Sequence, residues 1–316
     1  MKVSVIIPLY NKAPYIQRAL ASALAQTFES FELIVVDDGS TDGGHAVVER
    51  CGDPRVRLVR QDNVGPGAAR NRGLAEASAP FAAFLDADDE WFPTFLEKSL
   101  ACLEAHGPEV ACVSSGYVQY PAGKSMQPFW HRRGLRDGLY RLGPETSPLF
   151  AMYLLAYLCP WNTVVRIETA RKWGGYFDRG RCLYGEDSFL WLKVLLNESV
   201  AVRLEPLVGF HTEASALSKN IRGPRPVEPM LTHPESIEEI CPVELRPLLK
   251  NVLALRALKT ACMLGYWGRW REARSLLSRF CPWSAWRLPR FGVAQLVATP
   301  LGAGAGKLVR LLRGQG

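Results

Sequence analysis

An apolar segment that ends abruptly in carboxylates is the feature that most limits what this chain can fold into. Pro80–Leu85 reads Pro-Phe-Ala-Ala-Phe-Leu and is apolar throughout, as expected for a strand buried on both faces of a parallel sheet. Asp86, Asp88 and Asp89 follow at once. Because ligands bind at the carboxyl ends of the strands in an open α/β sheet, we expect these side chains at a binding edge.

The three aspartates need a compensating partner. Carboxylates this close together repel one another unless a cation or hydrogen-bond donors offset their charge. A ligand set made only of oxygen suits Mg²⁺ or Mn²⁺, which commonly also hold phosphate oxygens. The alternative is an acidic turn that caps the next helix. The short motif alone does not separate the two interpretations, so the accompanying motifs decide between them.

Strands and helices alternate along the first part of the chain. Short apolar segments rich in β-branched residues are each followed by a turn and a segment with helical spacing. This alternation predicts an α/β fold, with a Rossmann-like, mostly parallel sheet flanked by helices. The expected strands are residues 3–8, 31–36, 55–60 and 80–85, and the expected helices are 14–25, 44–50 and 68–77.

The rest of the sequence is less regular and ends in a helical extension. Segments rich in Gly and Pro at 120–148 and 223–234 predict a long loop and a linker. We therefore expect an α/β domain at residues 1–220 and a helical region at residues 221–316. The other expected strands are 110–117, 161–166 and an edge strand at 200–204; the other expected helices are 92–106, 168–172, 187–196 and a hairpin of 242–264 with 269–279.

Cysteine usage and the lack of long apolar runs indicate a cytoplasmic protein. The eight cysteines are scattered and none forms a Cys-x-x-Cys pair, which argues against structural zinc and for thiols in a reducing compartment. The apolar run that begins at Val3 is too short for a signal peptide or a membrane span. No stretch of about 18 uninterrupted apolar residues occurs, which is the length that a spanning helix needs.

Positive charge is concentrated at the C-terminal end. Residues 241–316 carry a net charge of +11 with only two acidic residues, which leaves −4 for residues 1–240 of the total of +7. From Cys281 onward, Trp283 and Trp286 occur among five cations and no acid. This pattern suits peripheral attachment to an anionic membrane surface. The alternative is a final helix packed on the core with a solvated basic face. We expect no nucleic-acid partner, because no nucleic-acid module accompanies the charge.

Two further motifs in the first part suit a nucleotide ligand. Asp38, with Asp37 beside it, ends the second expected strand and can accept a hydrogen bond from a base N–H or a ribose hydroxyl. Gly65 and Gly67 precede a helix that carries Arg70 one turn inside, an arrangement that attracts phosphate. The structural alternatives are a helix cap at the aspartates and an ordinary surface arginine.

Three features farther along the chain suit a transfer reaction. Glu186 and Asp187 open an amphipathic helix, where Asp187 is either an N-cap or a general base that takes a proton from an attacking hydroxyl. Gly174 and Gly175 form a flexible turn that lets a substrate approach the backbone. His211 follows an expected edge strand and is either structural or a metal ligand.

Taken in order, these motifs closely resemble family 2 glycosyltransferases of the GT-A fold. The resemblance covers about residues 1–215. The first four motifs are strongly specific in combination, whereas the Glu-Asp pair and His211 match more loosely. The motifs are Val5–Asn11, Val36–Asp42, Gly67–Asn71, Leu85–Asp89 and Gly185–Asp187.

The resemblance implies a nucleotide-sugar donor, usually uridine-linked, and Mn²⁺ or Mg²⁺ as the cofactor. Asp88 matches the ligand that binds the metal on the diphosphate, and Asp38 matches the residue that reads the uracil. The remaining residues that it implies for donor binding are Pro8, Tyr10 and Asn11 around the nucleotide, Arg70 near base or phosphate, and Asp86 with Ala87 at the ribose.

The resemblance also implies inversion at the anomeric carbon, with Asp187 as the general base and Glu186 helping to hold the acceptor. Gly174 and Gly175 match a glycine loop near donor and acceptor. His211 matches a histidine that binds metal in some relatives, although the usual Tyr-Arg before it is Gly209-Phe210 here.

The expected reaction adds one sugar to a glycan or lipid-linked acceptor in cell-surface polysaccharide synthesis. A processive synthase would carry Gln-x-x-Arg-Trp, but Tyr266 stands where its Gln would be. Two alternatives are open. A nucleotidyltransferase would need a Gly-rich basic loop after the first strand, where Leu9–Lys12 stands instead. A non-catalytic nucleotide-sugar binder is disfavoured by the intact Asp86, Asp88 and Asp187.

Overall fold

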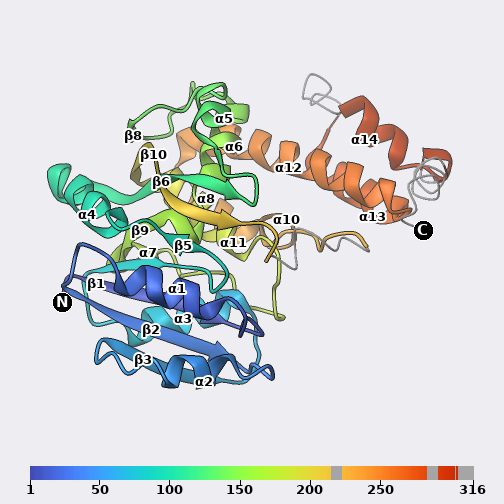
Figure 1. Cartoon of the computed structure of the whole chain (residues 1–316). Helices are drawn as coiled ribbons and strands as arrows, with labels where there is room; N and C mark the ends of the chain where they lie inside the picture. Colours follow the sequence, from blue (N-terminus) through green and yellow to red (C-terminus); the bar gives the residue numbers. More distant parts are fainter. Residues whose placement is uncertain (215–222, 283–290, 303, 305–316) are drawn as a thin grey trace. The chain divides into compact units, whose positions relative to one another are not determined.

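The computed structural model describes residues 1–214, 223–282, 291–302 and 304 (Figure 1). The chain divides into two compact units. Unit 1 consists of residues 1–142 and 153–219, and unit 2 consists of residues 143–152 and 220–316.

A mixed sheet of ten strands forms the centre of unit 1 (Figure 1). Its strands are β1 (Val3–Leu9), β2 (Phe31–Asp38), β3 (Val56–Gln61), β4 (Phe81–Phe84), β5 (Glu90–Trp91), β6 (Val110–Tyr120), β7 (Lys124–Ser125), β8 (Gly138–Tyr140), β9 (Thr163–Arg166) and β10 (Ser199–His211). The order is β3-β2-β1-β4-β9-β6-β10-β5, with β7 beside β6 and β8 beside β10. Strands β1 to β4 run parallel, β9 runs antiparallel between β4 and β6, and β10 runs parallel to β6.

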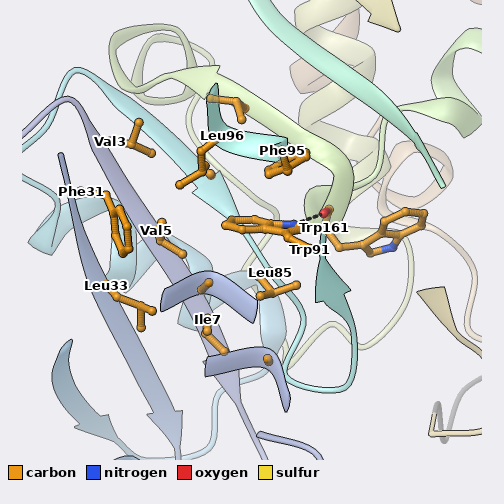
Figure 2. Packing of buried hydrophobic residues seen from close by; sticks show 14 of the residues in the cluster. Val3, Val5, Ile7, Phe31, Leu33, Leu85, Trp91, Phe95, Leu96 and Trp161 are labelled. Carbon is orange, nitrogen blue, oxygen red and sulfur yellow. Dashed lines mark hydrogen bonds between the residues drawn. The ribbon is translucent and has the colours of Figure 1, made fainter. Parts of the chain in front are cut away.

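One face of this sheet holds an apolar core made from alternate residues of its strands. The helices are α1 (Ile16–Leu24), α2 (Gly44–Glu49), α3 (Pro66–Glu76), α4 (Phe95–Ala105), α5 (Gln127–His131), α6 (Pro148–Tyr157), α7 (Ile167–Lys172) and α8 (Glu186–Asn197). Helices α1 and α4 bury their apolar stripes in this core, which removes nonpolar surface from water. Figure 2 shows the packing of Val3, Val5, Ile7, Phe31, Leu33, Leu85, Phe95 and Leu96.

Two buried tryptophans of this core contact each other. Trp91 stacks on Phe95 with ring centroids 4.4 Å apart. Its indole Nε1 donates a hydrogen bond of 2.8 Å to the carbonyl oxygen of Trp161 (Figure 2). The buried N–H therefore has a partner, as burial of a polar group requires.

The opposite face packs against α3. Ile34, Val36 and Ala69 form a separate buried cluster there. A Cβ at Gly73 would lie 2.4 Å from Cγ2 of Ile6, so a glycine is needed for α3 to lie this close to β1. Residues on both faces of β1 and β2 are thus buried, which explains their largely apolar sequences.

Unit 2 is helical. It contains α10 (Pro229–Thr232), α11 (Glu235–Glu238), α12 (Arg246–Tyr266), α13 (Trp270–Phe280) and α14 (Phe291–Val297). Helices α12 and α13 form an antiparallel hairpin, and α14 packs on both. Arg256 of α12 donates a 2.7 Å hydrogen bond from Nε to the buried Glu228. Trp283 and Trp286 lie outside the described residues.

Among the residues that the structure describes, no helix combines the length and the apolar character that crossing a membrane requires.

Most expected elements are confirmed, with ends that move by a few residues, but three expectations are wrong. The predicted loop at 120–148 contains β7, α5 and β8. The predicted edge strand at 200–204 is the first part of the longer β10, which has partners on both sides. Glu205 and Pro206 interrupt its apolar pattern, and the register shifts there while pairing continues. The predicted linker at 223–234 contains α10, in which Met230 and Leu231 are buried.

Candidate active site

The carboxyl ends of three neighbouring parallel strands form one edge of unit 1. Strand β1 pairs with β2 on one side and β4 on the other. Tyr10 follows β1 and is 43% exposed, whereas Pro8 pairs with Val36 inside the sheet. Asp38 ends β2 and Asp86 follows β4 by two residues. The topology thus brings together three motifs that are far apart in the sequence.

Asp86, Asp88 and Asp89 form a compact carboxylate cluster at this edge. One oxygen from each side chain lies within 4.8 Å of the others. Ala87 between them is buried, and so is Asp89, whose Oδ1 accepts a 2.8 Å hydrogen bond from the backbone N–H of His211. Burial, together with the nearby charges, raises the pKa of both Asp88 and Asp89. This excess of negative charge on oxygen ligands fits a hard divalent cation.

The ammonium group of Lys12 lies against Asp88 of this cluster. The Nζ atom of Lys12 is 2.6 Å from Oδ2 of Asp88 and 2.7 Å from the carbonyl oxygen of Ala214. Arg18 donates a hydrogen bond to the main-chain carbonyl of Asp88. Lys12 is not among the site residues predicted from the sequence; its place directly after Asn11, in the loop that follows β1, is the signal that could have identified it.

Asn11 fixes the loop that presents Lys12. Its backbone has a positive φ of 49°, a conformation that asparagine tolerates better than most residues. Its Oδ1 accepts a 2.8 Å hydrogen bond from the N–H of Thr41, and its own N–H donates to Oγ of Ser40 at 3.1 Å. The loops after β1 and β2 are therefore tied together.

Arg70 connects the aspartate cluster to the start of α8. It is buried on α3, and its two terminal nitrogens donate to Oδ1 of Asp86 at 2.7 Å and to Oε1 of Glu186 at 2.9 Å. Its guanidinium also lies 5.3 Å from the ring centroid of Tyr176. Burial opposes the charged form, but Asp86 and Glu186 raise the pKa of Arg70 above its ordinary value. The guanidinium is therefore a fixed positive charge between two acids.

Asp187 occupies the second position of α8, next to Glu186. Its Oδ1 accepts a 2.7 Å hydrogen bond from the N–H of Ser188. Burial, followed by the charge of Glu186, raises the pKa of Asp187 to about 7. The positive charge of Arg70 opposes this shift. A carboxylate with such a pKa can exchange a proton near neutral pH, which an ordinary aspartate does poorly.

Asp38 organises the loop between β3 and α3. Its Oδ1 accepts hydrogen bonds from Nε2 of Gln61 at 2.8 Å and from the N–H of Val64 at 3.0 Å, and its Oδ2 accepts one from the N–H of Gly65 at 2.9 Å. Asp38 therefore sets the position of the helix that carries Arg70. Its predicted contact with a base is not tested by these contacts and stays a prediction.

Gly174 and Gly175 lie just past the C-terminal end of α7, both with positive φ. A Cβ at Gly175 would lie 2.4 Å from Oδ1 of Asn71. That oxygen accepts a 2.8 Å hydrogen bond from the N–H of Tyr176, and Nδ2 of Asn71 donates back to the Tyr176 carbonyl at 2.8 Å. The glycine turn is thus held against α3, next to Arg70.

His211 ends β10 among carboxylates. Its Nδ1 lies 2.7 Å from Oε1 of Glu213 and its Nε2 lies 2.9 Å from Oε1 of Glu90, while Tyr120 stacks on its ring. Each ring nitrogen thus has a carboxylate partner, although the backbone of His211 contacts Asp89. The assignment of His211 as a metal ligand stays a prediction. The sequence analysis missed the two glutamates that flank it.

The family follows from a comparison with known proteins. Residues 4–170 match the model described as glycosyl transferase family 2, and they make up more than half of the chain. The chain therefore belongs to glycosyl transferase family 2.

A curated relative agrees with this membership. The succinoglycan biosynthesis protein ExoO of Rhizobium meliloti is 40% identical over 149 residues, which are 47% of this chain and 41% of that protein. The chain spans less than half the length of this and the other curated relatives considered.

Two solved structures share the fold at low identity. TarS 1–349 from S. aureus in complex with UDP-GlcNAc gives a TM-score of 0.59 at 20% identity, covering 100% of this chain and 88% of that one. The mannosyltransferase PcManGT from Pyrobaculum calidifontis, in complex with GDP-Man and Mn²⁺, gives 0.54 at 20% identity, covering 97% and 87%. The α/β fold expected from the sequence, that of GT-A glycosyltransferases, is confirmed.

Proposed function

We propose that this protein is an inverting glycosyltransferase that moves one sugar from a nucleoside-diphosphate donor, for which we expect a UDP-sugar, to a hydroxyl of a glycan or lipid-linked acceptor. One observation carries the proposal. Arg70 joins Asp86 of the aspartate cluster to Glu186, next to Asp187, so a charged donor site and an acid–base group lie on one connected network. The succinoglycan protein ExoO, whose sequence is similar, supports a place in polysaccharide synthesis.

The donor would lie across the carboxyl ends of β1, β2 and β4. Exposed Tyr10 and the loop at Asn11 offer a surface for the nucleotide, with Pro8 beneath them and Asp38 beside them. One carboxylate oxygen of Asp86 accepts a hydrogen bond from Arg70, and the other could accept one from a ribose hydroxyl. The donors named in the two structures of similar fold, UDP-GlcNAc and GDP-Man, support a nucleotide-sugar without choosing between bases.

The aspartate cluster would hold the metal. Asp88 is the proposed ligand, with oxygens of Asp86 and Asp89 within reach of the same ion. When bound, Mn²⁺ or Mg²⁺ would act as a Lewis acid that stabilises negative charge on the departing diphosphate. The Mn²⁺ in the mannosyltransferase of similar fold supports this assignment.

Asp187 would accept the proton of the acceptor hydroxyl as that hydroxyl attacks the anomeric carbon. A pKa of about 7 leaves part of the population ionised at neutral pH and makes the group basic enough to take a proton. Arg70 donates a 2.9 Å hydrogen bond to Glu186, which fixes the first turn of α8. Because Glu186 is engaged in this way, Asp187 is the carboxylate that we propose as the base. A single displacement with one base inverts the anomeric carbon and needs no covalent nucleophile.

The experiment that tests this function is a panel of UDP-, GDP- and dTDP-sugars, scored for release of the nucleoside diphosphate with Mn²⁺ and with a chelator. We expect one donor to be turned over and the turnover to vanish with the chelator. Asp88→Asn is expected to abolish turnover while its thermal unfolding stays near that of the wild type. Equal turnover with and without chelator would contradict the metal assignment, and no turnover of any donor with a range of glycan acceptors would contradict the function.

We also propose that unit 2 brings the enzyme to an anionic membrane surface, where a lipid-linked acceptor would be found. Arg271 and Arg274 are exposed on α13. Val293 and Leu296 are 57% and 63% exposed on α14, and Leu301, in the helical residues that follow the next turn, is 86% exposed. Exposed apolar side chains near cations suit the interface of an anionic bilayer.

The membrane proposal is tested with phosphatidylcholine vesicles that contain or lack phosphatidylglycerol. The full chain is expected to sediment with the anionic vesicles alone, and Leu296→Glu is expected to weaken that binding. Equal recovery with both vesicle types, or binding unaffected by the substitution, would contradict the proposed surface.

A further inference from the structure

We propose that Lys12 is a built-in competitor of the metal: its ammonium neutralises Asp88 in the metal-free protein, and a divalent cation must displace it to bind. The inference rests on the metal site of the proposed function. Lys12 is thereby a positioning residue that sets how tightly the metal binds.

The geometry places the two cations in competition for one oxygen of Asp88. Nζ of Lys12 lies 2.6 Å from Oδ2 of Asp88, and the two side chains are only 20% and 14% exposed. An ion bound to the same oxygen would put two positive charges within a few ångströms of each other, with little water to screen them. The ammonium has to leave Oδ2 before the metal can use it.

The structure also provides a place for the displaced ammonium. Nζ already donates a second hydrogen bond, of 2.7 Å, to the carbonyl oxygen of Ala214. An ammonium group that keeps this neutral acceptor and gains water does not become an unpaired buried charge, so its removal from Asp88 costs less than leaving it buried without a partner would.

The loop after β1 fixes the backbone of Lys12 whether or not the lysine side chain contacts Asp88. Asn11 is held by Thr41 and Ser40, so the backbone that presents the lysine is fixed by the loop after β2. Tyr15 lies beneath the ammonium, with its ring centroid 5.6 Å from Nζ. A short movement of the side chain is therefore sufficient for exchange.

The experiment measures Mn²⁺ binding alone, by titration calorimetry on the full chain without donor or acceptor. Lys12→Met is expected to bind Mn²⁺ about tenfold more tightly than the wild type, which corresponds to about 1.4 kcal/mol and to the loss of one charge-assisted hydrogen bond. The double variant Lys12→Met with Asp88→Asn is expected to lose the gain, because the freed oxygen is what the metal uses.

The matched control is Arg18→Met. Arg18 donates to the main-chain carbonyl of Asp88, so this change removes a nearby positive charge without freeing a carboxylate oxygen. Its Mn²⁺ affinity is expected to rise less than that of Lys12→Met, because no carboxylate oxygen is freed for the metal. Thermal unfolding of each variant verifies that it is folded.

Three results would overturn the inference. Equal gains in Lys12→Met and Arg18→Met would show general repulsion and no competition for the oxygen. Unchanged or weaker binding in Lys12→Met would show that the ammonium does not oppose the metal. Absence of Mn²⁺ binding in both the wild type and Lys12→Met would contradict the assignment of the aspartate cluster as a metal site. Because no sugar transfer is measured, a wrong donor or acceptor does not affect the outcome.

Discussion

Arg70→Met tests the connection between the aspartate cluster and α8. The side chains of Arg70 and Glu186 are 6% and 10% exposed, and that of Asp86 is 28% exposed. Removing one partner of a buried ion pair costs about 3–5 kcal/mol, and the partial exposure of Asp86 puts this site at the lower end, about 3 kcal/mol. For a domain of this size that loss lowers the melting temperature by about 6–12 °C.

The assay is thermal unfolding followed by circular dichroism, with Lys172→Met as the control. Lys172 forms a 2.8 Å ion pair with Glu198 but its side chain is 60% exposed, so its loss is expected to cost less than about 1 kcal/mol. Adding Glu186→Gln to Arg70→Met is expected to recover part of the loss, because one of the two uncompensated charges disappears.

A shift in Arg70→Met no larger than that in Lys172→Met would refute the reasoning. It would mean that water screens the contacts of Arg70 and that the guanidinium does not act as a buried counter-charge. Failure of Glu186→Gln to recover any stability would indicate that lost packing of the arginine, and not its charge, causes the effect.

The remaining predictions concern pH and close packing. Because Asp187 must be ionised to accept a proton and its pKa is about 7, kcat/KM is expected to rise from pH 6 to pH 8 in a pH–rate profile, and a flat profile would contradict its role. The raised pKa also means that the folded state binds more protons than the unfolded state between about pH 4 and 7, so this group stabilises folding less as the pH rises through that window. Asp187→Asn is therefore expected to have a higher melting temperature than the wild type at pH 8, and a lower one would show that the carboxylate is not destabilised by burial. A Cβ at Gly67 would lie 2.2 Å from the carbonyl oxygen of Phe177, so Gly67→Ala is expected to lower the melting temperature by several degrees. A Cβ at Gly292 would have no atom within 4 Å, so Gly292→Ala is expected to leave the melting temperature unchanged or to raise it. Equal shifts in the two variants would contradict the close packing of α3.

The fold was predictable where local pattern and tertiary packing agree. Strands β1, β2 and β4 are buried on both faces, so their sequences are largely apolar and their ends coincide with polar turns. The pattern fails at β10, where a register shift at Pro206 keeps the strand paired although its apolar pattern is interrupted. It also fails for β5, β7 and β8, which are two or three residues long and owe their conformation to the neighbouring strand.

The site was predictable as a set of motifs but not as a network of contacts. Strand order explains why Asp38 and Asp86 share an edge, because parallel strands end together. The connection from Arg70 to Glu186 joins residues 116 positions apart, and no local spacing reveals it. The same holds for Lys12 with Asp88, since a lysine in a loop is ordinarily a solvated surface charge.

The most direct test of the account separates the roles of Asp88 and Asp187. Donor binding is measured by calorimetry with Mn²⁺ and the donor identified in the nucleotide-sugar panel, and turnover is measured on the same preparations. Asp187→Asn is expected to bind the donor as the wild type does and to lose about 10²–10⁴-fold in kcat, while Asp88→Asn loses donor binding itself. Wild-type turnover in Asp187→Asn would contradict the assignment of the base. Undiminished Mn²⁺-dependent donor binding in Asp88→Asn would contradict the assignment of the metal site.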